Sequence, residues 1–352
     1  MLNSTTEMKD LWTYLASTDK PVVMYGMGNG ADKIIDVLDR YGVTVSDFFA
    51  SDGFVRGHSF HGKRVLSFSE VKEKYQDFII LLSFGTCRSE VLDIIYSLDR
   101  NFELYAPDVP VAGEELFNFE FFAEHKNELE RARDLLADER SKEIFDCVIN
   151  YRLTGKIGFL RSAVTAKSEV FEDILEVGKC RNYVDAGAYT GDTIRELYSF
   201  GAHPDRVTAL EPDPKTFKKL AKYAEEDPKV IPVNAGAWSK DTELLFNVEG
   251  NRNSGVSEKG TAVRMVALDS IESAHGADYI KYDVEGSERE ALLGTREIIS
   301  RSSPALMVAL YHRSRDIYDL VQLVHEIDPG YKLYVRRFEY IPDWDLNLIA
   351  VK

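Results

Sequence analysis

The chain has 352 residues, of which 44% are hydrophobic, and its formal net charge is −16. This length and apolar content are enough to fill two domain cores, while the negative charge argues against nucleic acid and anionic membranes, which attract clustered Lys and Arg. No apolar run is long enough to span a membrane, residues 1–10 lack the apolar core of a signal peptide, and the three cysteines form no C-x-x-C pair. We therefore expect a cytoplasmic protein without membrane or nucleic-acid partners, disulfide framework or thiolate zinc site.

Residues 1–112 are predicted to form a small parallel α/β domain, because apolar strand patterns alternate with helical ones. Expected strands cover residues 22–25, 45–50, 78–82 and 102–105. Gly26, Gly28 and Ala31 form a G-x-G-x-x-A loop after the first strand. Asp52 follows the second strand, where a carboxylate can bind a ribose.

This layout resembles the small Rossmann-like domain at the front of bacterial sugar-modifying enzymes, such as sialic-acid-type acetyltransferases and nucleotide-sugar dehydratases. Residues 62–70 repeat the G-x-x-V-x-x-x-x-E pattern of those domains. The resemblance implies a nucleotide or nucleotide-sugar ligand here. A purely structural or dimerising role is the alternative, and the oligomeric state stays open, with a homodimer among the options.

A helical connector is predicted over residues 113–178. Pro107, Pro110 and Gly113 mark its start, and residues 114–150 are rich in Glu, Lys, Arg and Leu at helical spacing without Gly or Pro. This pattern indicates one or two helices, and another is expected over residues 169–175.

Residues 179–352 are predicted to form a second doubly wound α/β domain. Strand patterns occur at 183–185, 207–210, 230–233, 279–283, 305–310, 332–335 and 346–351. The last two strands have no helix between them, so we expect them to be antiparallel neighbours. Seven strands with one reversed at the end, covered by helices on both faces, is the architecture of the Rossmann-like methyltransferases that use S-adenosylmethionine (SAM). A hairpin over 244–248 and 262–267 flanks a polar loop, residues 250–260, which is a candidate lid.

A small glycine-spaced loop follows the first strand of this domain and opens a helix. Such a loop brings backbone amides close to a nucleotide-like ligand. It has no P-loop lysine, and its acidic ends suit a ligand with ammonium and sulfonium charges and a ribose, such as SAM. The expected contacts are Asp185, Gly187, Ala188, Tyr189, Thr190, Gly191, Asp192 and Thr193.

Further polar groups follow other strands, and the carboxyl ends of parallel strands meet at one edge of a sheet. Glu211 lies where its carboxylate can accept hydrogen bonds from ribose hydroxyls. The turn Pro212-Asp213, the segment Asn234-Ala235-Gly236-Ala237-Trp238 and the acidic Glu285 complete the expected cofactor site, with residues 234–238 flanking the adenine.

The run from Lys281 to Glu288, with Ala291-Leu292 and Gly294 after it, resembles the K-x-D-V-E-G-x-E…A-L…G signature of the FkbM family of methyltransferases. The upstream V-D-A-G-A-Y-T-G-D-T and E-P-D motifs fall in the family's order, and the resemblance covers residues 150–352. It implies SAM-dependent methylation of hydroxyl oxygens on sugars, glycans or polyketide-type metabolites.

The candidate catalytic residues are Asp283 and His312 as proton acceptors, and Lys281, which can pair with a carboxylate or steady the substrate oxygen. We expect no metal ion, because the acids near Asp283 lie in one short stretch. Two alternatives stay open: an enzyme that acts through an NAD(P) or nucleotide-sugar site in the N-terminal domain, and a non-catalytic nucleotide-binding protein.

Overall fold

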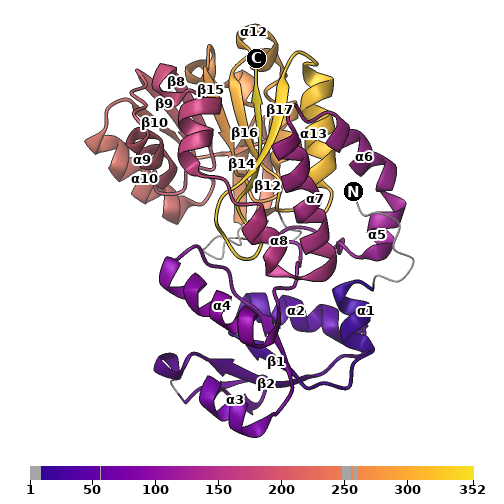
Figure 1. Ribbon diagram of the computed structural model, residues 1–352. Coiled ribbons are helices and arrows are strands. Elements are labelled where there is room, and N and C mark those ends of the chain that lie inside the picture. The colour runs from indigo at the N-terminus through magenta and orange to yellow at the C-terminus, as the bar shows by residue number, and fades with distance from the viewer. Residues whose placement is uncertain (1–8, 56, 248–254, 257–260) are drawn as a thin grey trace.

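The structure is a computed structural model that describes residues 9–55, 57–247, 255–256 and 261–352. It contains two α/β domains, each built on its own sheet, with helices between them (Figure 1). The predicted lid over residues 250–260 lies outside the described residues, except for Gly255–Val256. Within the described ranges, none of the helices combines the length and the apolar character that crossing a bilayer requires.

The N-terminal domain is a parallel five-stranded sheet in the order β5-β2-β1-β6-β7. Alternate residues of β1 enter two cores: Met24 packs on the face covered by α1 and α2, and Tyr25 on the face covered by α4 and α8. The predicted strands of this domain are confirmed. Its elements are α1 (Leu11–Ala16), β1 (Val22–Tyr25), α2 (Asn29–Arg40), β2 (Val45–Ala50), β3 (Ser59–Phe60), β4 (Lys63–Arg64), β5 (Leu66–Ser67), α3 (Phe68–Lys74), β6 (Ile79–Leu82), α4 (Ser89–Asn101) and β7 (Glu103–Tyr105).

The connector holds three helices between residues 114 and 154, where one or two were expected. The region has no Gly or Pro, but two polar residues start new helices. Asn118 accepts a hydrogen bond from the Phe121 amide, and Asp138 accepts one from the Ser141 amide. The elements are α5 (Phe119–Glu124), α6 (Lys126–Asp134), α7 (Glu139–Thr154), α8 (Ile157–Ser162) and a π-helical turn, η2 (Glu169–Ile174).

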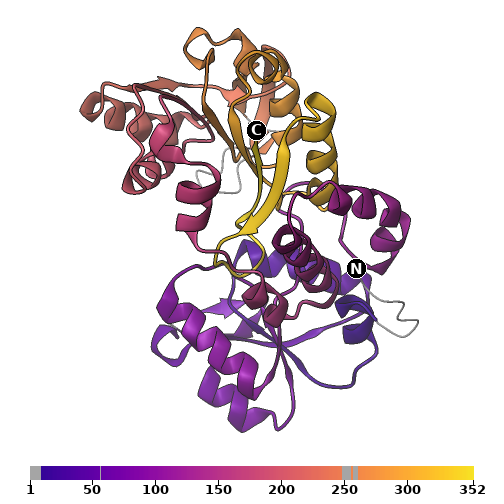
Figure 2. The same cartoon turned by 45° about the horizontal axis from the view of Figure 1, so that its top comes forward.

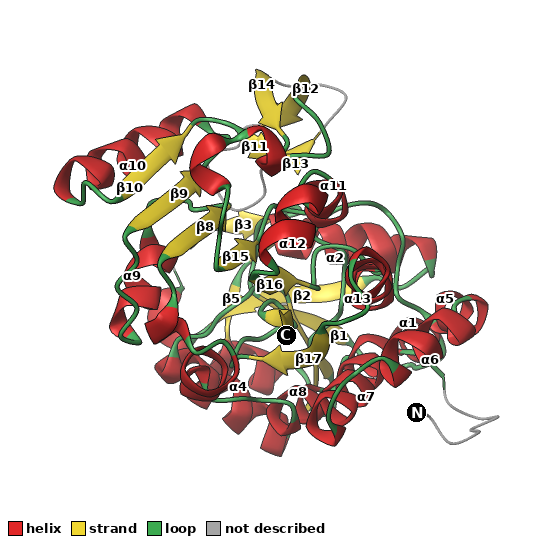
Figure 3. Cartoon of the chain, turned by 90° about the horizontal axis from the view of Figure 1, so that it is seen from above, coloured by secondary structure: helices red, strands yellow, loops and turns green. Residues whose placement is uncertain are grey.

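The C-terminal domain contains a seven-stranded sheet in the order β10-β9-β8-β15-β16-β18-β17. Only β18 is reversed, and it lies between β16 and β17, so the predicted antiparallel pair is confirmed. Figure 3 shows β10, β9, β8, β15 and β16 following one another across the sheet. The elements are β8 (Asn182–Ala186), α9 (Asp192–Ser199), β9 (Arg206–Leu210), α10 (Pro214–Glu226), β10 (Val230–Val233), β15 (Tyr279–Tyr282), α11 (Glu288–Leu293), α12 (Arg296–Ser302), β16 (Ala305–Ala309), α13 (Asp316–Ile327), β17 (Lys332–Arg337) and β18 (Leu346–Val351).

A smaller sheet in the order β11-β14-β12-β13 lies beside the large one. The predicted hairpin is confirmed, because β12 and β14 pair antiparallel. The strands are β11 (Gly236–Ala237), β12 (Thr242–Asn247), β13 (Gly255–Val256) and β14 (Thr261–Val266).

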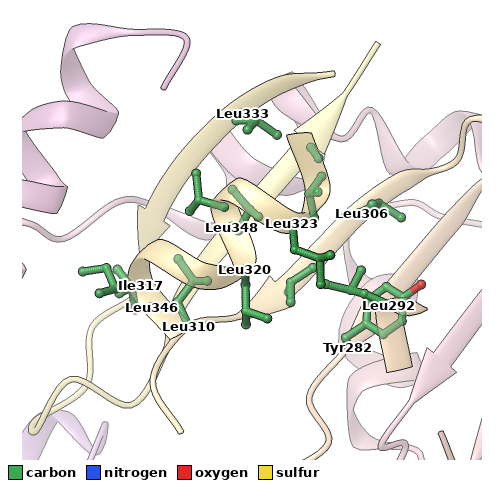
Figure 4. Packing of buried hydrophobic residues seen from close by; sticks show 14 of the residues in the cluster. Tyr282, Leu292, Leu306, Leu310, Ile317, Leu320, Leu323, Leu333, Leu346 and Leu348 are labelled. Atoms are coloured by element: carbon green, nitrogen blue, oxygen red, sulfur yellow. The ribbon is translucent and has the colours of Figure 1, made fainter. Parts of the chain in front are cut away.

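The two faces of the large sheet are packed differently. On one face, Leu306, Leu333 and Leu348 pack with α13, which contributes Ile317 and Leu320 (Figure 4). The other face lies under α9 and the π-helical turn, and its side chains include aromatic, sulfur-containing and charged groups. They include Tyr183, Asp185, Tyr279, Lys281 and Met307. Charged side chains on a covered sheet face mark this side as the place for a ligand.

The loop between β17 and β18, at the lower end of the yellow strands, reaches the N-terminal domain (Figure 2). Thr86, which follows β6, exchanges two backbone hydrogen bonds with Ile341, which follows β17. A second contact is the hydrogen bond from the Ala112 amide to the His312 carbonyl. The ends of β6 and β17 therefore lie at the junction of the two domains, and the carboxyl edge of a parallel sheet is where ligands commonly bind.

Candidate functional site

A cavity of about 390 Å³ opens at the carboxyl edge of the large sheet. Its wall combines the glycine loop after β8 with the ends of β9, β10 and β15. The predicted residues on this wall are Gly187, Tyr189, Asp192, Thr193, Glu211, Pro212, Asp213, Ala235, Gly236, Ala237, Lys281, Asp283 and Glu285. The predicted residues off the wall are Asp185, Ala188, Thr190, Gly191, Asn234, Trp238 and His312.

The glycine loop is fixed by backbone geometry. Gly187 has φ +92°, and a methyl group added to it would overlap the carbonyl of Asp283. The amides of Gly187 and Ala188 both donate to the Leu210 carbonyl, at 3.1 and 2.8 Å. The loop therefore touches the ends of both neighbouring strands, β9 and β15, which only glycine allows at position 187.

Asp185 lies beneath this loop and is fully buried. One carboxylate oxygen accepts a hydrogen bond from the Thr193 hydroxyl, and the other lies 3.7 Å from the Lys281 ammonium. Burial raises the pKa of Asp185. The hydrogen bond to Thr193 and the ion pair with Lys281 hold these two side chains in the cavity wall. Asp185 therefore supports the site without lining it.

Glu211 faces the cavity at the end of β9. Its Oε1 accepts a hydrogen bond from the Asp213 amide at 2.8 Å, and burial raises its pKa to about 7. The side chain of Asn234 donates to the Glu211 carbonyl at 2.8 Å and to the Pro212 carbonyl at 3.2 Å. Asn234 thus braces the Glu211 turn from outside the wall.

Trp238, the largest side chain predicted to flank the adenine, does not line the cavity. Trp238 packs outside the cavity against Val263 and Met265. Met265 takes its place on the wall beside Gly236, where an added Cβ would lie 2.7 Å from the Met265 side chain. A polarizable thioether can pack on an adenine ring.

Asp283 is surrounded by donors. Its carboxylate accepts a hydrogen bond from the Tyr311 hydroxyl at 2.9 Å and lies 3.5 Å from both Lys281 Nζ and His312 Nε2. Burial alone would raise the pKa of Asp283, but Lys281, His312 and Tyr311 together lower it. Lys281 pairs with Asp283, as predicted from their spacing of two along one strand.

His312 is fully buried behind the wall, between three carboxylates. Nδ1 lies 2.9 Å from Glu288, an ion-pair distance without the alignment of a hydrogen bond, and Nε2 lies 3.4 Å from Glu285. Burial would lower the pKa of His312, but Glu288 and Glu285 raise it well above the ordinary value. In this state the imidazole is a cation that cannot accept a proton near neutral pH.

Asp283, Glu288 and His312 offer ligand atoms within 4.8 Å of one another, which is close enough to consider a metal ion. However, Glu288 approaches Nδ1 of the ring and Asp283 approaches Nε2, on the opposite edge. A metal ion would bind His312 through one deprotonated ring nitrogen, whereas the surrounding carboxylates favour the protonated ring by raising the pKa of His312. The imidazolium itself lies where a cation would balance the carboxylates.

Several wall residues escaped prediction. Tyr311 lies at the carboxyl end of β16, and counting by two from Met307, the register partner of Lys281, would have found it. The wall residues that lie away from the glycine loop, here called the distal end of the cavity, come from separate segments without a motif. They are Cys87, Lys167, Phe171, Phe338, Trp344 and Asn347.

The N-terminal glycine loop has other contacts. A methyl group on Gly30 would overlap the Ser83 carbonyl, so this glycine permits a close approach of two loops. Asp52 accepts hydrogen bonds from the amide and hydroxyl of Ser69 at 3.1 and 2.7 Å, and so supports the start of α3. Nucleotide binding by this domain stays a prediction.

The fold and the cavity define an α/β protein of the Rossmann-like methyltransferase type. Residues 185–333 match the model of the methyltransferase FkbM domain. The chain is also similar to the solved methyltransferase FkbM from Methylobacillus flagellatus KT, with 20% identity over 94% of this chain and 90% of that chain and a TM-score of 0.72. This likeness extends the shared fold to the N-terminal domain.

Weaker matches cover about half of the chain. Fibrillarin from Aeropyrum pernix, solved with S-adenosyl-L-methionine, is 14% identical over 49% of this chain and 66% of that chain, with a TM-score of 0.34. Precorrin-6y C5,15-methyltransferase from Geobacter metallireducens GS-15 is 14% identical over 54% and 90%, also with 0.34. A comparison with curated proteins found no match.

Proposed function

We propose that the protein is a SAM-dependent methyltransferase that methylates a hydroxyl group of a sugar, glycan or related metabolite. One observation carries this proposal: the glycine loop at Gly187, the carboxylate of Glu211 and the carboxylate of Asp283 share one cavity wall. The methyltransferase FkbM domain over residues 185–333 supports the same activity.

The wall chemistry fits the ribose, the adenine and the sulfonium of the cofactor. Glu211 can accept hydrogen bonds from the two ribose hydroxyls. Residues 235–237 and Met265 supply small and polarizable surfaces for the adenine. When bound, SAM supplies an electrophilic methyl group on a sulfonium cation, and the surrounding carboxylates favour a cationic guest.

The chain's own part in the reaction is to orient the acceptor hydroxyl and to take its proton. The hydroxyl oxygen forms the new bond to the methyl carbon, the carbon–sulfur bond breaks with its electron pair staying on sulfur, and the proton moves to a base. A positioned base contributes about 10²–10⁴-fold.

Glu285 is the better proton acceptor of the two wall carboxylates after β15. Burial raises the pKa of Glu285, whereas Asp283 is held ionised by Lys281, His312 and Tyr311. Glu285 also has φ +54°, a strained value for a side-chain-bearing residue, and such strain is often kept at functional sites. We assign Glu285 as the base and Asp283 as the group that orients the substrate oxygen through Tyr311 and Lys281.

The test is calorimetry with SAM followed by kinetics. Wild-type protein should bind SAM, and Glu211→Ala should weaken binding by at least about tenfold, because a buried ribose would lose its acceptor. Glu285→Gln should lower kcat by about 10²-fold or more with an unchanged Kd for SAM. Wild-type protein that does not bind SAM contradicts the function, and a raised Kd in Glu285→Gln contradicts the role as base.

The alternatives predict other readouts. An NAD(P) enzyme would change nicotinamide absorbance and would depend on Gly26 and Gly28 instead of Glu211. A non-catalytic protein would bind SAM without turnover. Mass spectrometry of a ligand that co-purifies with the protein separates an adenosyl compound from a nucleotide or nucleotide-sugar.

A further inference from the structure

The cavity has two ends, and only one is accounted for by the cofactor. The cofactor end is formed by the glycine loop, Glu211 and Met265. The distal end includes Cys87 and Trp344, from the junction of the two domains, and Phe171 and Phe338, which pack with α9 on the sheet face. An acceptor that reaches Asp283 and Glu285 from the other side must occupy this distal end.

The N-terminal domain helps to build the distal end. Cys87, in the loop between β6 and α4, belongs to the wall. Gly85 in the same loop supports Trp344, because an added Cβ would lie 2.5 Å from the indole ring. Thr86 pairs with Ile341 through the two backbone hydrogen bonds described above. The loop therefore fixes the position of Trp344 in the acceptor's path.

The charged side chains of the cavity wall are mostly negative. Among the described residues, seven carboxylates and two lysines line the cavity. Both lysines are paired: Lys167 with Glu196, and Lys281 with Asp283 and Asp185. An anionic group on the acceptor would meet carboxylates without finding an unpaired cation, a like-charge juxtaposition that costs binding free energy.

The uncharged chemistry of the distal end suits hydroxyl groups and C–H faces. Phe171, Phe338 and Trp344 offer aromatic surfaces. The Asn347 side chain donates a hydrogen bond through its Nδ2 to the Asp345 carboxylate at 3.1 Å. The oxygen atoms of these two side chains can accept hydrogen bonds from hydroxyl groups of a ligand. Aromatic faces beside hydrogen-bond acceptors suit a polyhydroxylated ring.

We propose, on the basis of the function proposed above, that the methyl acceptor is a glycoside without phosphate or carboxylate groups, bound at the domain junction against Trp344. Nucleotide-sugars, sugar phosphates and uronic acids are then rejected by the charge of the wall. The N-terminal domain takes part in acceptor recognition through the loop at residues 85–87.

The experiment uses full-length protein saturated with S-adenosylhomocysteine and matched pairs of probes: methyl glucoside and methyl glucuronide, methyl galactoside and methyl galacturonide, and glucose and glucose 6-phosphate. Calorimetry measures the affinity of this saturated protein for each probe, and methyl transfer from labelled SAM is measured separately in the absence of S-adenosylhomocysteine. We expect at least one neutral member to bind at least about 30-fold more tightly than its anionic partner. Anionic partners that bind equally well, or a panel in which no neutral member binds, overturn the proposal.

Two variants make the test specific. Glu196→Gln releases Lys167 from its ion pair and should raise the affinity for glucose 6-phosphate at least about fivefold. The matched control Glu297→Gln removes a carboxylate from an exposed ion pair with Arg301 and should leave that affinity unchanged. Trp344→Phe keeps an aromatic ring and should raise KM for the neutral glycoside less than Trp344→Ala. Equal effects of Glu196→Gln and Glu297→Gln count against the charge argument.

Failure of this inference is distinguishable from failure of the proposed function. Protein that does not bind SAM lacks the function itself. Protein that binds SAM and methylates a phosphorylated or carboxylated sugar keeps the function and disproves only the acceptor class.

Discussion

Gly187 lies directly against the carbonyl group of Asp283, so the glycine loop and the end of β15 share one van der Waals surface. A side chain at position 187 would displace the strand end that carries Asp283. The backbone at Gly187 also has φ +92°, which other residues rarely adopt. The glycine loop and the Asp283 carboxylate are therefore positioned together.

Gly187→Ala should weaken SAM binding at least about 30-fold, because the loop and Asp283 must separate to make room for the methyl group. Calorimetry measures this effect. Gly201→Ala is the matched control: Gly201 has φ +79° and has no atom within 4 Å of an added Cβ. The Gly201→Ala variant has the same kind of backbone strain but no steric overlap, and it should bind SAM with wild-type affinity. Equal losses in both variants would attribute the effect to strain alone.

The affinity for SAM should depend on the protonation of Glu211. Its pKa of about 7 lies above the ordinary 4.5, and ribose hydroxyls donate to the ionised form. Affinity should therefore rise up to about tenfold per pH unit between pH 5.5 and 7 and then level off. Calorimetry across this range measures it. Glu211→Gln should bind weakly with a flat profile, and a flat profile in the wild type contradicts the prediction.

The carboxyl group of Glu211 should also make the stability of the ligand-free protein depend on pH, and here stability falls as the pH rises. Because its pKa is raised in the folded protein, its stabilising contribution is complete below about pH 4.5 and is lost as the pH rises through about 7. Glu211→Gln should therefore stabilise the ligand-free protein at pH 8, by at most ~3 kcal/mol, and have little effect at pH 5. Urea unfolding at the two pH values measures it, and equal effects at both would contradict the linkage.

The sequence predicted the site where local rules are sufficient. Glycine spacing, strand ends and the alternation of side chains led to Gly187, Glu211, Asp283 and Lys281 on one wall. The same alternation, extended past β16, places residues 307 and 311 on the cavity wall. His312, the more basic side chain predicted as a proton acceptor, is buried behind the wall, with its ring 4.2 Å from that of Tyr311.

The distal end depends on contacts between segments far apart in the chain. Cys87 and Trp344 meet only because the N-terminal domain docks on the loop between β17 and β18. No local pattern encodes that docking. Met265 lines the cavity in place of Trp238 for a similar reason. The pairing of β11 with β14, which lie apart in the chain, decides which of the two side chains faces the cavity.

Lys281 and Asp185 should depend on each other for stability. Asp185 is fully buried, and Lys281 lies 3.7 Å away with little exposure. Lys281→Met leaves a buried carboxylate without its cation and should cost about 3–5 kcal/mol. Asp185→Asn/Lys281→Met removes both charges and should be more stable than the sum of the single variants predicts. Urea unfolding of the four proteins completes the cycle, and additive changes would mean that the two groups do not interact.

Chelation should leave the protein active. The imidazolium of His312 already supplies a positive charge between Asp283, Glu285 and Glu288. Dialysis against EDTA should leave the rate of methyl transfer and the affinity for SAM unchanged. A loss of rate that Mg²⁺ or Mn²⁺ restores would contradict this reading of the site.

His312 should act as a buried cation that holds the loop after β15. It lies between Asp283, Glu285 and Glu288, and its pKa is well above the ordinary 6.5. Its contribution to stability is therefore complete below pH 6.5 and is lost only as the pH rises through the higher pKa of the folded protein.

His312→Gln leaves the carboxylates without a balancing cation and should lower the free energy of unfolding by about 3–5 kcal/mol at pH 7. The loss should be smaller at pH 5, where carboxylates can take up protons. Glu288→Gln in the same chain removes the carboxylate nearest the ring and should recover part of the loss, which urea unfolding measures. NMR of the imidazole nitrogens should find His312 protonated at pH 8, and titration near pH 6.5 would return it to the role of proton acceptor.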